Sequence, residues 1–213
     1  MRGRQEPARF GVVIYDGVEP IDLGATFGVL SMARRFLPGV TPLTIAPRPG
    51  VVRLASGLQV VAELGFADRP TLDALILCGG AGWVAAAADP AMLDFLRRPG
   101  HGLVASVCTG AMILGAAGLL AGHRATTRRH AVGGESEAPL RRLAAQAASV
   151  VEAVLVDAGP IVTGGGVSLA TDLTLHLIGR FYGEAVAAEI ARAIEYDRAR
   201  AANGAALGMV RSG

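Results

Sequence analysis

The chain has 213 residues, of which 52% are hydrophobic and 18% are charged, and its formal net charge is +2. This length fits one large domain with a buried core, and the nearly balanced charge argues against a nucleic-acid-binding stripe. The chain contains no lysine, which excludes a Schiff-base lysine, pyridoxal phosphate chemistry and a Walker-type phosphate loop. Arginine pairs, expected in solvated helix ends and loops, occur at residues 34–35, 97–98, 128–129 and 141–142.

Histidine and cysteine usage predicts neither a metal site nor a disulfide. The four histidines lie far apart, without a spacing such as H-x-x-x-H, so we expect no bound metal. The two cysteines, Cys78 and Cys108, occupy dissimilar local sequences, and residues 1–10 are polar without an apolar segment. We therefore expect a cytoplasmic protein with reduced thiols.

Strands and helices alternate along the first half of the chain. Short apolar runs predict strands at residues 9–15, 41–46, 51–53, 59–63 and 73–78. The third and fourth of these strands are expected to form a hairpin. A helix is predicted over residues 19–35, and another begins at Pro90 with Asp89 as its N-cap.

The second half of the chain repeats this alternation. Strands are predicted at residues 102–107, 124–127, 152–157 and 161–163, and helices at residues 112–120, 138–147, 167–181 and 183–196. The pattern predicts an α/β fold with a single, mostly parallel, flavodoxin-like sheet sandwiched by helices. The domain is expected to span residues 9–197, with flexible tails at residues 1–8 and 198–213.

An uncharged stretch of 21 residues, 102–122, is the most informative segment. Its length alone fits a membrane-spanning helix. However, a β-branched run ends at Val107, small residues interrupt at Cys108, and a small-residue helix follows. A strand that breaks sharply into a helix leaves one side chain standing at the turn, as in the nucleophile elbow of hydrolases. We therefore predict that Cys108 occupies such an elbow, and we expect no membrane association.

A cysteine at this turn has a chemical use. The free N–H groups and the positive dipole end of the following helix favour thiolate over thiol and can hold an anion that develops during attack. The alternative is that Cys108 is a small buried hydrophobe, as we expect for Cys78 at the end of its strand. Ligands of parallel α/β sheets bind beyond the carboxyl ends of the strands. Cys108, the Gly79-Gly80 turn and Gly165 all fall at such ends.

Three segments together resemble the ThiJ/PfpI superfamily, and the resemblance covers residues 10–196. The segments are Pro20-Ile-Asp22-Leu-Gly-Ala, Cys78-Gly79-Gly80-Ala81-Gly82 and Ser106-Val-Cys108-Thr109-Gly110-Ala. The fold of that family is similar to the fold of class I glutamine amidotransferases. The cysteine segment looks most like the isonitrile (isocyanide) hydratase branch, and similar sequences occur in domains of AraC-type regulators. The resemblance implies an elbow cysteine, an acidic residue that approaches its sulfur, and a homodimer.

The chain departs from the family pattern at two places. Members of the hydratase branch usually place His and then Trp after Ala-Thr-Thr, where this chain has Arg128-Arg129-His130. Protease-like relatives place a histidine directly after the elbow cysteine, where this chain has Thr109. A Cys–His dyad on adjacent residues is absent, and we therefore do not expect peptidase activity.

Asp22 admits two interpretations. At the start of a helix an aspartate is ordinarily a cap or a partner of the helix dipole. In its apolar segment it can instead be partly buried with a raised pKa, so that the protonated carboxyl donates a hydrogen bond to sulfur and later delivers a proton. The resemblance favours the second interpretation. Asp172 is a secondary candidate for the lining of the site at Cys108, although we expect a helix-surface or capping role for it. His176 is expected in the core with its polar atoms hydrogen-bonded.

The resulting hypothesis is the addition of water to an isonitrile. Cys108 thiolate attacks the terminal carbon while Asp22 supplies a proton, which gives a thioimidate. Asp22 then activates water, and an N-substituted formamide is released without a metal or organic cofactor. Thr109 completes the catalytic set. The expected substrate- and oxyanion-binding residues are Gly79, Gly80, Ala81 and Gly110, with Gly165 as a secondary candidate.

Two other functional classes remain open at this point. One is a glyoxalase or deglycase, in which Cys108 attacks a small aldehyde. The other is a non-enzymatic redox or ligand sensor that uses the same cysteine. Direct DNA binding is not expected, because little sequence follows Tyr196. We expect a small-molecule substrate and a homodimer with residues 20–30 near its interface.

Overall fold

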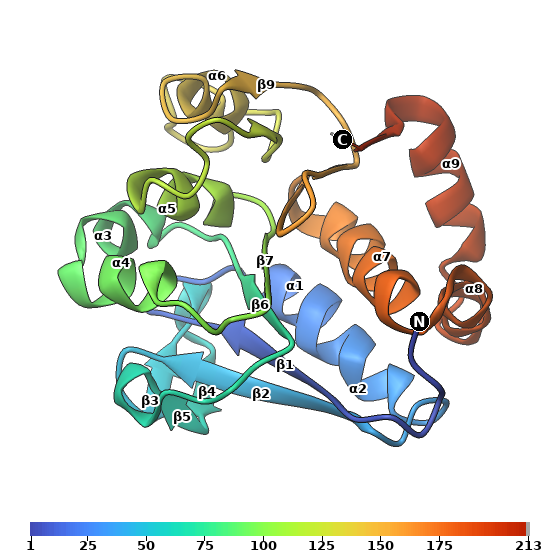
Figure 1. The fold of residues 1–213 in the computed structure, drawn as a ribbon. Coiled ribbons are helices and arrows are strands. Elements are labelled where there is room, and N and C mark those ends of the chain that lie inside the picture. Colours follow the sequence, from blue (N-terminus) through green and yellow to red (C-terminus); the bar gives the residue numbers. More distant parts are fainter. Residues whose placement is uncertain (212–213) are drawn as a thin grey trace.

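The computed structural model describes residues 1–211 and contains an eight-stranded sheet (Figure 1). The strand order is β12-β10-β11-β7-β6-β1-β2-β5. The strands are β1 (Ala8–Val13), β2 (Val40–Ala46), β5 (Leu64–Gly65), β6 (Ala74–Leu77), β7 (Leu103–Ser106), β10 (Leu155–Asp157), β11 (Ile161–Gly164) and β12 (Met209–Arg211). All neighbouring pairs are parallel except β10 and β11. The predicted α/β class with a mainly parallel sheet is confirmed.

Two short pairs of strands lie outside this sheet. Strands β3 (Gly50–Arg53) and β4 (Gln59–Ala62) form the predicted antiparallel hairpin. Strands β8 (Arg124–Ala125) and β9 (Ser149–Val150) pair in parallel. Directly after β8, Thr126 donates its backbone N–H to Thr163 Oγ1 near the end of β11. The chain after residue 125 is thereby attached to the main sheet, on the side of the predicted elbow.

The helices form two groups (Figure 1). One contains α1 (Pro20–Leu23), α2 (Val29–Ala33) and α7 (Ala170–Tyr182), and the other contains α3 (Trp83–Ala88), α4 (Pro90–Arg97) and α5 (Gly110–Ala116). Helix α6 (Pro139–Leu143) contacts α5, helix α8 (Glu184–Ala193) packs on α7, and α9 (Asp197–Leu207) contacts α8. Asp89 caps α4 as predicted by accepting a hydrogen bond from the Ala91 N–H at 3.0 Å. Helix α3 was not predicted.

A π-helical turn (Gly24–Gly28) joins α1 to α2 within the predicted helix over residues 19–35. Thr26 Oγ1 donates to the Asp22 carbonyl at 2.8 Å inside this turn. Such side-chain bonds compete with the regular backbone ladder, and π turns occur frequently at functional sites. The irregular turn begins two residues after Asp22.

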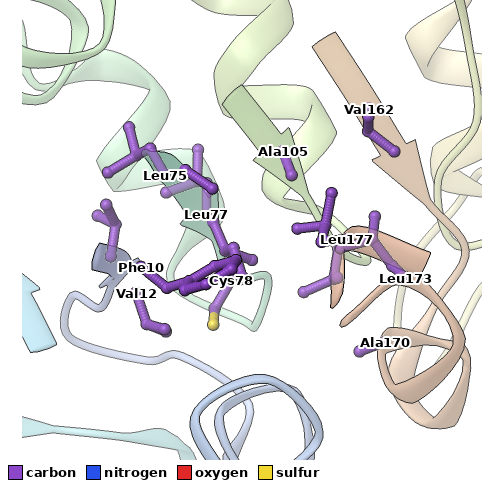
Figure 2. Close-up of a cluster of buried hydrophobic side chains, with 14 of the residues drawn as sticks. Phe10, Val12, Leu75, Leu77, Cys78, Ala105, Val162, Ala170, Leu173 and Leu177 are labelled. Atoms are coloured by element: carbon purple, nitrogen blue, oxygen red, sulfur yellow. The ribbon is translucent and has the colours of Figure 1, made fainter. Parts of the chain in front are cut away.

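The core lies between the sheet and the helices (Figure 2). Figure 2 shows Phe10 and Val12 of β1 beside Leu77 of β6, all among buried apolar side chains. Cys78 belongs to this cluster and is fully buried. Its expected structural role agrees with this position. None of the helices in residues 1–211 is both long and apolar enough to cross a membrane.

The expected flexible tails differ from the structure. Residues 197–207 form α9, and Met209–Arg211 pairs with β10 as β12, while residues 212–213 of the expected tail lie outside the described residues. The alanine-rich sequence favours a helix, and Asn203 anchors it by donating to Asp172 Oδ2 at 2.9 Å. At the other end, Arg2 forms a 2.5 Å ion pair with Asp73. Both ends of the described chain are therefore tied to the domain.

Candidate active site

Cys108 stands between β7 and α5 in a left-handed backbone conformation, with φ of +52°. A non-glycine residue adopts this conformation at a cost, so the surrounding structure must hold it. The Cys108 N–H donates to the Gly165 carbonyl at 3.0 Å, and Thr127 Oγ1 donates to the Cys108 carbonyl at 2.5 Å. These bonds fix the strand–turn–helix geometry that the sequence predicts.

The Cys108 thiol is buried, with 3% of the residue exposed. Burial raises its pKa to about 12, and the nearby Asp22 carboxylate contributes to this rise. Hydrogen bonds from the backbone N–H groups of Thr109 and Val167 lower the pKa, but they do not outweigh the loss of hydration. The helix end lowers the pKa of Cys108, in the expected direction, but desolvation is the larger effect and the net pKa is raised. The sulfur carries its proton until another group removes it.

Asp22 is a buried group that can exchange a proton with this sulfur. It is 0% exposed, and burial raises its pKa from 3.8 to about 7. Its Oδ2 accepts the Gly79 N–H at 2.9 Å, and the nearby Cys108 thiol acts on the carboxyl and lowers its pKa. Oδ1 has no hydrogen-bond partner among residues 1–211. The side chain does not cap α1, so the buried interpretation of Asp22 fits the structure.

The glycine turn after β6 packs directly against the elbow. A Cβ atom at Gly79 would lie 2.5 Å from the Thr109 nitrogen and 2.8 Å from Cys108 Cβ, so only glycine fits there. The Gly80 N–H donates to Thr109 Oγ1 at 2.9 Å, and that hydroxyl in turn lies 3.3 Å from the Gly80 carbonyl. The Thr109 hydroxyl and the Gly80 N–H are thus already paired with each other. The Thr109 N–H, in contrast, acts on the sulfur and lowers the pKa of the thiol.

Three of the predicted residues lie away from the reacting sulfur or serve packing. A Cβ atom at Gly110 would lie 2.3 Å from the Leu77 carbonyl oxygen, so Gly110 allows α5 to approach β6. Gly165 holds the Cys108 backbone through its carbonyl. Asp172 does not line the cavity at Cys108. It is buried beside a separate cavity of about 380 Å³ and accepts a hydrogen bond from Tyr196 at 2.8 Å.

A cavity of about 770 Å³ opens over the elbow. Its lining includes Cys108, Thr109, Gly80 and Ala81, and it also includes apolar side chains, namely Ile21, Trp83, Val84, Val132 and Val167. Predicted residues from separate strand ends therefore meet at one site. This arrangement follows from the parallel register, in which Leu77 of β6 pairs with Ser106 of β7.

Arg128 also lines this cavity, so the expected solvated position of this arginine is wrong. The residue is only 8% exposed, and its Nη2 forms a 2.5 Å ion pair with Glu135. The available signal was its position directly after Ala125-Thr126-Thr127, the place where the sequence departs from the pattern that the resemblance implies. The pairing of β8 with β9 turns this short segment inward.

His176 is buried in α7, as expected, and its Nε2 lies 2.8 Å from Asp157 Oδ2. Burial lowers the pKa of His176, while the neighbouring Asp157 opposes this shift. His130 is exposed. Neither histidine lines the cavity over Cys108.

Comparison with known proteins identifies relatives of this arrangement. The sequence profile of the DJ-1/PfpI family matches residues 8–180. The chain is 33% identical to the isonitrile hydratase of Pseudomonas putida over 190 residues, which cover 88% of this chain and 78% of that protein. It is 30% identical to the HTH-type transcriptional regulator GbdR of Pseudomonas aeruginosa, covering 92% of this chain but only 53% of the regulator.

A solved structure shares the fold at similar coverage. It is a ThiJ/PfpI family protein from Pseudomonas syringae, with a TM-score of 0.77 and 28% sequence identity. The match covers 91% of this chain and 76% of that chain. Relatives of this chain therefore include both a named enzyme and a named regulator.

Proposed function

Because the chain belongs to the DJ-1/PfpI family, we propose that it is an isonitrile hydratase-like lyase that converts an isonitrile and water into an N-substituted formamide. Similarity to an isonitrile hydratase over 88% of the chain supports this choice of reaction. The observation that carries the proposal is the buried Asp22 Oδ1, which lacks a hydrogen-bond partner in residues 1–211 and belongs to the carboxyl beside Cys108. A carboxyl in this position can exchange protons with both sulfur and substrate.

The first step joins the substrate to the enzyme. Asp22 carboxylate accepts the thiol proton of Cys108 as the sulfur attacks the terminal carbon of the isonitrile. A carbon–sulfur bond forms, and Asp22 delivers the proton to the same carbon. The product is a thioimidate, R–N=CH–S, attached to Cys108. A pKa of about 7 suits Asp22 to both directions of transfer near neutral pH.

The second step uses water. Asp22 takes a proton from the water, the water oxygen bonds to the thioimidate carbon, and the proton passes to the nitrogen. The carbon–sulfur bond then breaks, and the hydroxyl proton returns through Asp22 to the sulfur. R–NH–CHO leaves with the Cys108 thiol restored. The Thr109 and Val167 N–H groups, which bond the sulfur, stabilise its negative charge as it leaves.

The lining of the cavity supports an apolar substituent on the isonitrile. Ile21, Trp83 and Val84 contribute apolar surface to its wall. A volume of about 770 Å³ exceeds the size of a small cyclic group and falls in the range of small-molecule sites. Cyclohexyl isocyanide is therefore the first substrate to test.

The decisive assay measures formamide release from a panel of alkyl and aryl isonitriles. Cys108→Ala is expected to abolish turnover, and Asp22→Asn is expected to slow it by roughly a hundred- to ten-thousand-fold. Cys78→Ala is the matched control, because Cys78 is buried in the core and does not line the cavity. It should retain turnover. Lactate formation from methylglyoxal without any formamide from the panel would contradict the proposal and favour glyoxalase chemistry.

We also propose that the working unit is a homodimer whose second copy covers the cavity mouth. Ile21, Val84 and Val132 line the cavity and are 53%, 58% and 57% exposed. Within the predicted interface segment 20–30, Leu30 is buried in its own chain, whereas Ile21 is an exposed large apolar side chain and is available for such a contact. Light scattering after size exclusion should give a dimer for the wild type and a monomer for Val84→Asp. A wild-type monomer with full hydratase activity would refute this arrangement.

A further inference from the structure

Arg128 is placed beside Cys108 by the packing of its stem and by the contacts of neighbouring residues, independently of its charge. Thr127, the preceding residue, donates its hydroxyl to the Cys108 carbonyl at 2.5 Å. The aliphatic part of the Arg128 side chain lies against Gly166, where a Cβ atom would come within 2.6 Å of Arg128 Cγ. The residue after Gly166 is Val167, whose backbone N–H lowers the pKa of the Cys108 thiol. Both the backbone and the stem of Arg128 are thus tied to groups that touch Cys108.

The guanidinium has few partners at this site. Nη2 pairs with Glu135 Oε1 at 2.5 Å, and Nη1 donates to the His130 carbonyl. Glu135 Oε2 accepts the Val132 N–H at 3.0 Å. Glu135 therefore connects Arg128 to residues 130–138, several of which line the cavity wall.

We propose that Arg128 is a further catalytic residue, whose buried positive charge stabilises the Cys108 thiolate, and that Glu135 limits this effect by competing for the guanidinium. The inference rests on the proposed function, in which Cys108 is the nucleophile. It concerns the part of the site where this chain differs from the His-Trp pattern of similar hydratases. Arginine remains charged at all relevant pH values, so this positive charge is permanent.

The charge balance around the sulfur explains why a cation is needed. The titratable groups that act on Cys108 from neighbouring elements are Asp22, Cys78 and Tyr15, and each becomes negative or stays neutral. Among them and Arg128, only Arg128 is positive. The cavity is also lined by Glu19, Glu135, Glu137 and Arg142, and the Arg142 guanidinium lies over the Trp83 ring, 5.5 Å from its centroid. A charge in a buried site acts through a low dielectric and is screened less than at the surface. Arg128 is the cation that acts on the Cys108 sulfur and supplies a counter-charge to the thiolate formed during attack.

A purely structural role for Arg128 makes a different prediction. In that case the Arg128–Glu135 pair would only clamp the wall formed by residues 130–138. Removing either partner would break the same ion pair and loosen the same wall, so both substitutions would change access to the thiol in the same direction. If Arg128 acts through its charge, the two substitutions change the alkylation rate of the Cys108 thiol in opposite directions.

The experiment follows alkylation of Cys108 by iodoacetamide, in which the sulfur displaces iodide and the thiol proton goes to solvent. Initial rates are measured over a range of pH values by mass spectrometry of the Cys108 peptide in the wild type, Arg128→Gln, Arg128→Lys and Glu135→Gln. Arg129→Gln is the matched control, because the neighbouring Arg129 pairs with Glu152 at 2.8 Å and does not line the cavity over Cys108. Circular dichroism verifies that each variant is folded.

We expect Arg128→Gln to alkylate roughly tenfold more slowly at a given pH, as for a shift of about one pKa unit. Glu135→Gln should react severalfold faster, and Arg128→Lys and Arg129→Gln should stay close to the wild type. If Arg128→Gln and Glu135→Gln changed the alkylation rate in the same direction, or if neither substitution changed it, the inference would be overturned. Alkylation needs no isonitrile, so this test is independent of the hydratase assay. Failure of the hydratase proposal would appear separately, as the absence of formamide from the isonitrile panel.

Discussion

Replacing Asp22 with asparagine should change how the stability of the protein depends on pH. Asp22 is fully buried, and burial raises its pKa from 3.8 to about 7. The folded protein therefore holds a proton that the unfolded chain has already released at intermediate pH. The contribution of Asp22 to stability is present below the unfolded pKa and is lost as pH rises through the folded pKa.

The size of this effect follows from the shift. Each pKa unit corresponds to about 1.4 kcal/mol, so a shift of about three units removes roughly 4 kcal/mol of stability from the wild type between about pH 4 and pH 7. The asparagine side chain of the variant cannot ionise and lacks this term. The stability of Asp22→Asn relative to the wild type should therefore rise by roughly 4 kcal/mol over the same interval. Any constant cost of the substitution, such as an unpaired amide, does not alter this slope.

Urea unfolding at a series of pH values measures the difference directly. Other groups with shifted pKa values are the same in both proteins and cancel. Asp73→Asn is the control of opposite sign, because the pKa of Asp73 is lowered by its hydrogen bonds to Arg2 and Arg9, although burial opposes them. The stability of Asp73→Asn relative to the wild type should rise only as the pH falls. A pH-independent difference between Asp22→Asn and the wild type would refute the buried, proton-holding carboxyl.

Three further substitutions test how the elbow and the carboxyl-terminal helix are packed. Gly110→Ala should lose about 1–3 kcal/mol of unfolding free energy, because the new Cβ would lie 2.3 Å from the Leu77 carbonyl. Gly204→Ala in α9, where the added Cβ meets no atom within 4 Å, should be neutral or stabilising in the same urea titration. Tyr196→Phe removes the 2.8 Å bond to Asp172 and should cost about 1 kcal/mol. Faster hydrogen exchange in residues 197–207 would report it, and unchanged exchange would contradict this anchoring role.

The sequence by itself determined the features that depend on local rules. Period-two and continuous apolar runs located the strands, and Asp89 followed by Pro90 marked the start of α4. The break from a β-branched run into Cys108 predicted the elbow, because few other local structures change direction so sharply. The order of these elements was enough to predict a parallel α/β sheet, and hence a site beyond its strand ends.

The tertiary structure alone decided properties that come from residues distant in the chain. The pKa values of Cys108 and Asp22 depend on burial by several elements, and this desolvation outweighs the helix end that the sequence indicates. Arg128 enters the cavity only because its segment is tied to β9, to Cys108 and to Gly166. The order of α9 likewise depends on contacts with α7 and α8. Local sequence carries propensities and turns, whereas burial and charge balance arise only when separate segments are packed together.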